Sequence, residues 1–85
     1  MTSEGNLIRL LRNVPVRDLE RALLRDGFVL RRTRGSHHFY VHPDGRIANI
    51  YYHGSNESLP RGTLANILQT TRWTEDDARR LGLLP

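Results

Sequence analysis

The sequence predicts a small α+β domain in which a helix precedes three antiparallel strands, and a second main helix and a short C-terminal helix follow them. Apolar residues recur at three- and four-residue spacing in two segments, which is typical of amphipathic helices. Between these segments, β-branched and aromatic residues flank the turn sequence Pro43-Asp44-Gly45, which is typical of a β-hairpin. A chain of 85 residues without cysteine supports one thin core and no disulfides.

The N-terminal part of the chain divides into two segments. Residues 1–13 are expected to form a tail or a short extra helix, and residues 14–85 a single domain. Pro15 suits the first turn of a helix over residues 15–26, and Gly27 can end that helix in a left-handed conformation. The apolar stripe of this helix consists of Val16, Leu19, Ala22 and Leu23. The apolar residues of the first segment suit the core, a dimer contact or a partner interface equally well.

The middle of the chain predicts three strands, over residues 28–33, 37–42 and 47–52. Gly35-Ser36 breaks the chain between the first two. Pro43 sets φ and Gly45 accepts a positive φ, so the second and third strands form a hairpin.

The C-terminal part predicts a main helix after Pro60 and a short helix from Thr74 to about Gly82. The buried stripe of the main helix consists of Leu64, Ile67, Leu68 and Thr71. Thr74 can cap the short helix, and the acidic residues that follow it oppose the positive end of the helix dipole. Because three strands in so short a chain cannot bury two faces, both main helices should cover one face and leave the other open for a ligand.

The charge is positive and concentrated around the histidines. All 13 basic residues are arginine, and the formal net charge is +4. Residues 31–53 carry four arginines against one acidic residue, Asp44. Arginine binds phosphate in a bidentate fork, which suits nucleic acid, although a GC-rich genome also favours arginine over lysine. No apolar stretch is long enough to span a membrane and no signal peptide is evident, so a cytoplasmic location is expected.

All four histidines lie between residues 37 and 53. Strand alternation sends His37 to one face and His38 and His42 to the other, unless a bulge near Gly35-Ser36 alters the pattern. His38, His42 and His53 do not have a recognised zinc spacing, and we expect neither a metal nor a cofactor. His38 and His42 are better interpreted as surface or hydrogen-bonded structural histidines.

A histidine can cleave RNA without a metal, because its ordinary pKa near 6.5 lets it take or give a proton at neutral pH. In such a reaction the ribose 2′-hydroxyl attacks the adjacent phosphorus, and an arginine or a backbone N–H stabilises the developing charge. On the residues alone, however, a binding or structural role for His37 is favoured over a catalytic one.

Four segments together resemble the HicA family of toxins, over about residues 15–82. They are Gly27-Phe28, the run from Gly35-Ser36-His37 to Tyr40, the run from His42 to Arg46, and the run from Pro60 to Leu68. The resemblance implies a double-stranded-RNA-binding-domain-like α-β-β-β-α fold, an mRNA-cleaving activity, and neutralisation by a HicB-type antitoxin. The family's essential histidine follows Gly-Ser or Gly-Gly and corresponds to His37. A second family histidine corresponds to His53. The family usually has a proline two residues before this histidine, and Tyr51 occupies that position here.

Several other residues are candidates for binding substrate. Arg32, Arg34 and Ser36 adjoin His37 in the sequence, and Arg61 and Thr63 lie where the second main helix presents free N–H groups to a phosphate. The arginines also suit a solvated strand edge, and Thr63 also suits a purely structural helix entry. Aromatic residues 40, 51 and 52 are expected in the core or the sheet, and Trp73 as a cover for the end of the second main helix, rather than in the site.

The function that follows is a toxin that cleaves mRNA with His37 as the general acid or base, without a metal. The alternatives are an RNA-binding module of the same fold that does not cut, and an interaction protein for which RNA is irrelevant. RNA and a HicB-type antitoxin are the expected partners, with no membrane and no small-molecule cofactor.

Overall fold

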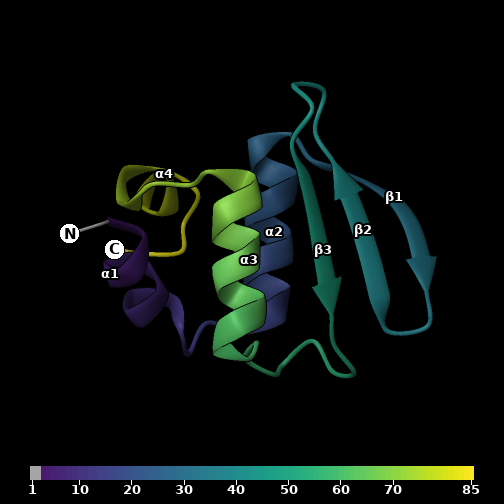
Figure 1. The fold of residues 1–85 in the computed structure, drawn as a ribbon, viewed down its shortest axis with the longest axis horizontal. Helices are drawn as coiled ribbons and strands as arrows, with labels where there is room; N and C mark the ends of the chain where they lie inside the picture. Colours follow the sequence, from purple (N-terminus) through teal and green to yellow (C-terminus); the bar gives the residue numbers. More distant parts are fainter. Residues whose placement is uncertain (1–2) are drawn as a thin grey trace.

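The chain forms helices and strands in the predicted order within residues 3–85, which are the residues that the computed structural model describes (Figure 1). The helices are α1 (Ser3–Leu11), α2 (Val16–Asp26), α3 (Arg61–Thr71) and α4 (Glu75–Arg80). The strands are β1 (Val29–Arg34), β2 (His37–Val41) and β3 (Ile47–Tyr51). The order from α2 to α3 is the predicted α-β-β-β-α arrangement, consistent with the double-stranded-RNA-binding-domain-like fold, and α4 is the predicted extra helix.

The strands form one antiparallel sheet in the order β1-β2-β3. β3 lies nearest the helices and β1 is the outer edge strand (Figure 1). All six residues of β1 are exposed. β1 carries charged side chains, and charge on an exposed edge strand opposes pairing with strands of other chains.

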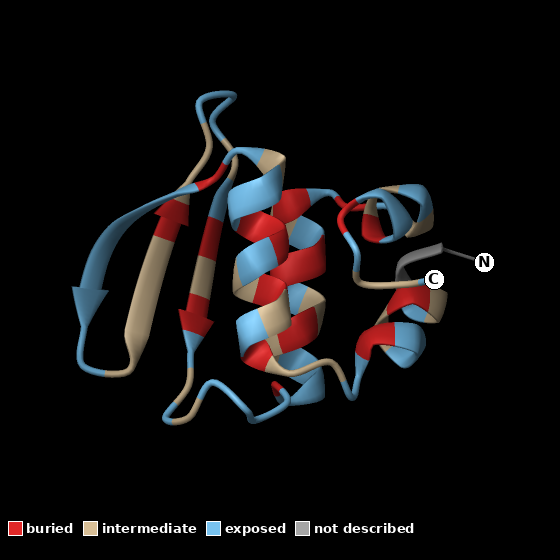
Figure 2. Ribbon diagram, turned by 180° about the vertical axis from the view of Figure 1, so that it is seen from behind, coloured by how far each residue is buried: buried red, intermediate tan, exposed pale blue. Residues whose placement is uncertain are grey.

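α2 and α3 pack on one face of the sheet, as predicted. Their buried stripes contain the predicted residues, Val16, Leu19, Ala22 and Leu23 in α2 and Leu64, Ile67, Leu68 and Thr71 in α3. Figure 2 shows buried positions in red on β2, β3 and both helices, and these residues belong to one core cluster. The sheet contributes Tyr40, Ala48 and Ile50 to this core, whereas Ile47 and Tyr51 on the other face are exposed.

The ends of α2 are fixed by backbone geometry. Pro15 is extended, with φ −69° and ψ 152°, so it precedes the helix instead of forming its first turn, and α2 begins one residue later than predicted. The free N–H of Val16 donates to the carbonyl of Glu57 at 2.8 Å, which satisfies one of the groups that a helix start leaves open. Gly27 ends the helix in the predicted left-handed conformation, with φ 107°.

The strands differ from the predicted ranges by one residue at several ends. β1 begins at Val29 and not at Phe28, because the Phe28 N–H donates to the carbonyl of Leu23 at 2.9 Å and thereby belongs to the end of α2. The β2–β3 turn is as predicted: Gly45 has φ 97°, and its N–H donates to the carbonyl of His42 at 2.9 Å.

The N-terminal segment is a helix that contributes to the core. Leu7 and Leu11 of α1 are each 1% exposed, whereas Leu10 is 43% exposed. α1 packs against α3, on the side of the helices away from the sheet (Figure 1). The sequence left these apolar residues a place in the core, in a dimer contact or in a partner interface. Leu7 and Leu11 are in the core.

At the other end of the chain, α4 has the predicted cap. The Thr74 hydroxyl accepts a hydrogen bond from the Asp77 N–H at 3.2 Å, and the Asp77 carboxylate accepts from the Thr74 N–H at 2.9 Å. This reciprocal pair is a capping box. Gly82, with φ 87°, follows the helix as predicted.

Candidate functional site

His37 is the first residue of β2 and lies on the open face of the sheet, away from α2 and α3. Residues directly opposite one another in adjacent strands share a face. The register therefore places His37 in a row with Arg34 of β1 and Tyr51 of β3. The next row along the same face consists of Arg32, Phe39 and Asn49.

A β-bulge at Arg31 determines which arginines accompany His37. Leu30 and Arg32 pair with adjacent residues of β2, so Arg31 has no partner residue of its own. In a regular strand, Arg32 and Arg34 would share the helix-covered face with Leu30, because successive side chains alternate. The bulge resets this alternation and brings Arg32 and Arg34 to the open face.

Two residues of β3 hold the His37 ring. The Nε2 atom of His37 lies 2.6 Å from Oδ1 of Asn49. The ring stacks on Tyr51, with centroids 4.3 Å apart and an interplanar angle of 6°. With Asn49 Oδ1 as acceptor, Nε2 carries the ring proton. Within residues 5–85, no side chain or backbone group forms a hydrogen bond with Nδ1 of His37, so this nitrogen is the one left for a ligand.

A shallow depression of about 400 Å³ adjoins the two holding residues. Asn49 and Tyr51 form one wall, and residues from the N-terminal part of α3, including Gly62, Thr63 and Asn66, form the other. The predicted site residue Thr63 is therefore brought to the side of the sheet residues that contact His37. A ligand in this depression would meet both elements.

The basic residues beside His37 have no acidic partners in the described part of the chain. The ion pairs that residues 5–85 form involve arginines on α2 and α4 and Arg46, which pairs with Asp26 at 3.0 Å and Asp44 at 2.8 Å. Arg32 and Arg34 are exposed and belong to none of them. The row containing His37 therefore carries positive charge that is available to an anion.

Two further predicted residues, Ser36 and His53, lie at the same end of the sheet. Ser36 directly precedes β2, and its carbonyl accepts a hydrogen bond from the Tyr52 N–H at 3.0 Å, which extends the pairing of β2 and β3. His53 follows Tyr52 and is exposed. Its N–H and that of Gly54 donate to the Glu57 carboxylate, at 3.2 and 3.0 Å. These donors, Gly54 first, lower the pKa of Glu57.

Arg61 is the one predicted site residue that the structure places away from His37. Arg61 lines a different groove, between α1 and α3, together with Arg9 and Arg12. Gly62 and Thr63, the next residues of α3, line the depression beside Asn49 instead. The reason is helical geometry, because a rotation of 100° per residue turns neighbouring side chains to different sides.

Of the two histidines expected to be surface or hydrogen-bonded residues, His42 is hydrogen-bonded, whereas His38 is half-buried and one of its ring nitrogens has no partner. His42 Nε2 lies 2.7 Å from the carbonyl of Asp26, and its Nδ1 lies 3.0 Å from the Asp44 carboxylate. His38 stacks on Tyr52, and its Nδ1 is buried without a hydrogen-bond partner. Among the described residues, no three histidine or carboxylate side chains come together to hold a metal ion.

The sequence-based interpretation missed Asn49 and Tyr51. Both lie in a strand that was expected to be structural, and Tyr51 was assigned to the sheet and not to the site. The available signal was the alternation of β3, which sends Asn49 and Tyr51 to one face. Only the register shows that this is the face of His37.

The fold and the site together define a class: a small α+β protein with a basic open sheet face and a histidine at one end of that face. The family model for the HicA toxin of bacterial toxin–antitoxin systems matches residues 16–73. The chain therefore belongs to the HicA toxin family, and an antitoxin is its partner within such a system. No curated protein sequence matches the chain. No helix in the described part of the chain is long and apolar enough to cross a membrane.

Proposed function

We propose that this toxin is a metal-independent endoribonuclease that cleaves mRNA in the cytoplasm, with His37 as its catalytic residue. The observation that supports this best is the environment of His37. Asn49 engages Nε2 at 2.6 Å, so Nδ1 is left to exchange a proton with a ligand on an open and basic face. A histidine fixed by a second side chain is the usual arrangement of a general acid or base.

In the proposed reaction, His37 assists attack of a ribose 2′-hydroxyl on the adjacent phosphorus as the general base, or protonates the leaving oxygen as the general acid. Arg32 and Arg34 share the face of His37 and stabilise the negative charge that develops on the phosphoryl oxygens. Ser36, His53 and Thr63 lie at the rim and contact the RNA. DNA lacks the 2′-hydroxyl and is not cut.

The proposed antitoxin is of the HicB type and binds over the open face. Tyr51 and Ile47 on this face are 56% and 40% exposed, so a partner would bury apolar surface as well as the basic row. Bound there, the antitoxin excludes RNA from His37.

The test is cleavage of a labelled single-stranded RNA in EDTA by the wild type, His37→Ala and His53→Ala. We expect His37→Ala to lose about 10²- to 10⁴-fold in rate, the usual contribution of a general acid or base. His53→Ala, which removes an exposed histidine from the rim, should still cut at saturating RNA. Circular dichroism establishes that each variant is folded.

Two results would contradict the proposal. If the wild type binds the RNA and leaves its length unchanged, the protein is an RNA-binding module and not a nuclease. If His37→Ala cuts as fast as the wild type, the activity belongs to another residue. An RNA with a single 2′-deoxyribose at the cleaved position is the substrate control, and it should remain intact.

A further inference from the structure

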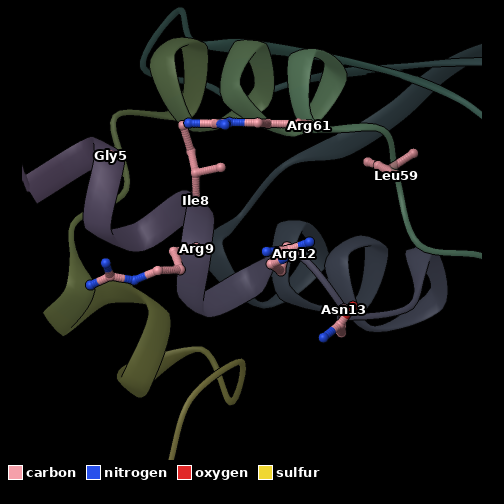
Figure 3. A pocket seen from close by; sticks show the side chains of 7 residues that line it. All are labelled: Gly5, Ile8, Arg9, Arg12, Asn13, Leu59 and Arg61. Atoms are coloured by element: carbon pink, nitrogen blue, oxygen red, sulfur yellow. The ribbon is translucent and has the colours of Figure 1, made fainter.

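A second hollow lies on the other side of the first turn of α3 from the depression beside Asn49. Figure 3 shows this second hollow from close by. It has a volume of about 430 Å³ and lies between α1 and the start of α3. We call it the α1–α3 groove and define it by Ile8, Arg9, Arg12, Leu59 and Arg61. Neither the candidate site nor the matched family segment, residues 16–73, includes its α1 wall.

The groove is basic. Figure 3 shows the Arg61 side chain running from α3 toward Ile8, with Arg12 at the end of α1 below it. Arg9 lies on α1, which Arg12 directly follows, and the Arg9 guanidinium donates to the side chain of Asn6. No acidic residue within residues 5–85 lines the groove, and none of these three arginines belongs to an ion pair formed by those residues.

The position of Arg61 is not explained by the fold alone. It is the first residue of α3, at the positive end of the helix dipole, where a cation is unfavourable. The first turn of α3 contains no acidic residue, and Pro60 before it supplies no side-chain cap. The described residues that line this hollow include three arginines and no carboxylate, so an anion bound there would be attracted by three positive charges.

We propose that the α1–α3 groove binds backbone phosphates of the RNA strand at a distance from the cleaved bond. This inference rests on the proposed function, because it assumes that RNA occupies the depression beside His37. Thr63 lines that depression and Arg61 lines the groove, on opposite sides of the first turn of α3. A helix is about 10–12 Å across, which corresponds to about three or four nucleotides at roughly 3.4 Å each.

Phosphate suits this groove better than a carboxylate chain does. An RNA strand that leaves the depression past Thr63 reaches Arg61 after about three or four nucleotides, so one continuous ligand can occupy both the site and the groove. Arginine forks bind the non-bridging oxygens of backbone phosphates bidentately and tolerate any base sequence. The groove therefore adds affinity for RNA without adding sequence preference.

The test measures RNA binding by full-length chains that carry His37→Ala, so that the RNA stays intact. A labelled single-stranded 12-nucleotide RNA is titrated at salt concentrations between 50 and 200 mM. The variant combines Arg9→Gln, Arg12→Gln and Arg61→Gln. The control combines Arg17→Gln, Arg21→Gln and Arg79→Gln, which removes the same charge from exposed positions outside the groove.

Losing three phosphate contacts should reduce the slope of log affinity against log salt by about 2, since each contact to a single strand contributes about 0.7. Over this salt range the protein with an intact groove should therefore lose roughly 20-fold more affinity than the groove variant. The control should keep the slope of the parent. Replacing the same three residues by lysine should restore most of the slope, because the charge returns, and melting followed by circular dichroism verifies folding.

Equal slopes for the groove variant and the control would overturn the proposal. The proposal would also be overturned if the groove variant bound RNA normally but lost binding to a polyglutamate peptide. The groove would then be a site for an acidic protein segment. Failure of the proposed function has a different signature. If the chain with His37 intact binds the 12-nucleotide RNA in EDTA but leaves its length unchanged, catalysis is refuted, whereas the salt slopes still decide whether the groove binds RNA.

Discussion

His37 depends on a side chain that is far from it in the sequence. Asn49 is twelve residues away, and its Oδ1 lies 2.6 Å from Nε2. A histidine on a strand end rotates freely unless a second group fixes it, and a fixed ring presents one defined nitrogen to its ligand. At the scale of single residues, Asn49 is therefore the positioning residue for His37, and Tyr51 supports the ring from its face.

Asn49→Ala should reduce the rate of RNA cleavage by about 10- to 100-fold, the usual cost of losing a group that orients a functional histidine. Single-turnover kinetics with saturating RNA measure this effect. The loss should be in the rate and not in RNA affinity, because Asn49 acts through the histidine. An affinity loss with an unchanged rate would show that Asn49 binds RNA directly.

Asn49→Asp distinguishes positioning from simple packing. A carboxylate beside Nε2 favours the charged imidazolium, because opposite charges at this distance attract. The limb of the pH–rate profile that His37 governs should therefore move to higher pH, whereas Asn66→Asp, at another position lining the depression, should move it less. Identical profiles for the two variants would exclude the direct role of Asn49.

At the scale of elements, α4 is short and depends on its cap. The Asp77 carboxylate accepts hydrogen bonds from the Thr74 N–H and hydroxyl, at 2.9 and 3.1 Å, and pairs with Arg80 at 3.1 Å. The backbone bond from Thr74, followed by Arg80, lowers the pKa of Asp77. A six-residue helix has little stability of its own, so these contacts and the packing of Ala78 hold it.

Asp77→Ala should lower the free energy of unfolding by about 1 kcal/mol at pH 7. Because the folded-state pKa is lowered, the contribution is present above the ordinary pKa of an aspartate, near 3.9, and is lost as the pH falls through the lower folded value. The difference from the wild type should thus be constant between about pH 5 and 8 and shrink below about pH 4. Urea unfolding at several pH values measures it.

Asp76→Ala is the matched control for this change. Asp76 occupies the same turn of α4 and interacts with the same helix dipole, but its side chain is 98% exposed and its ion pair with Arg79 is long, at 3.6 Å. Its replacement should cost at most a few tenths of a kcal/mol. Equal effects of the two substitutions would mean that the dipole, and not the capping box, stabilises α4.

At the scale of the whole molecule, α1 is part of the domain core although it precedes the family-matched segment. Leu7 and Leu11 are buried against the same cluster as Leu64 and Ile67 of α3. The face of α3 that packs against α1 lies away from the open sheet face. α1 therefore contributes stability and the wall of the α1–α3 groove, and it does not approach His37.

Leu7→Ala should lower the free energy of unfolding by about 2 to 4 kcal/mol, the range for emptying a buried leucine site. Leu10→Ala, in the same helix but 43% exposed, should cost less than about 1 kcal/mol. Urea unfolding at fixed pH provides both values. Small and equal costs would indicate that α1 is detached from the core in solution.

Much of the fold follows from local sequence. The three- and four-residue spacing in α2 and α3 predicts the buried stripes, because a helix repeats its faces every 3.6 residues. Gly27 and Gly45 mark a helix end and a turn, since both have a positive φ that other residues avoid. Thr74 marks the cap of α4. The candidate histidine, His37, came instead from the resemblance of Gly35-Ser36-His37 to the HicA family, because these residues alone favoured a binding or structural role.

The rest was decided by contacts between segments that no local pattern encodes. The bulge at Arg31 brings Arg32 and Arg34 to the face of His37, and a shift of one residue would send both to the other face. The register of β2 with β3 selects Asn49 as the partner of His37. Packing of α1 on α3 leaves Arg61 in a groove away from the histidine. Sequence periodicity thus fixes which residues share an element, whereas register and packing fix which elements meet.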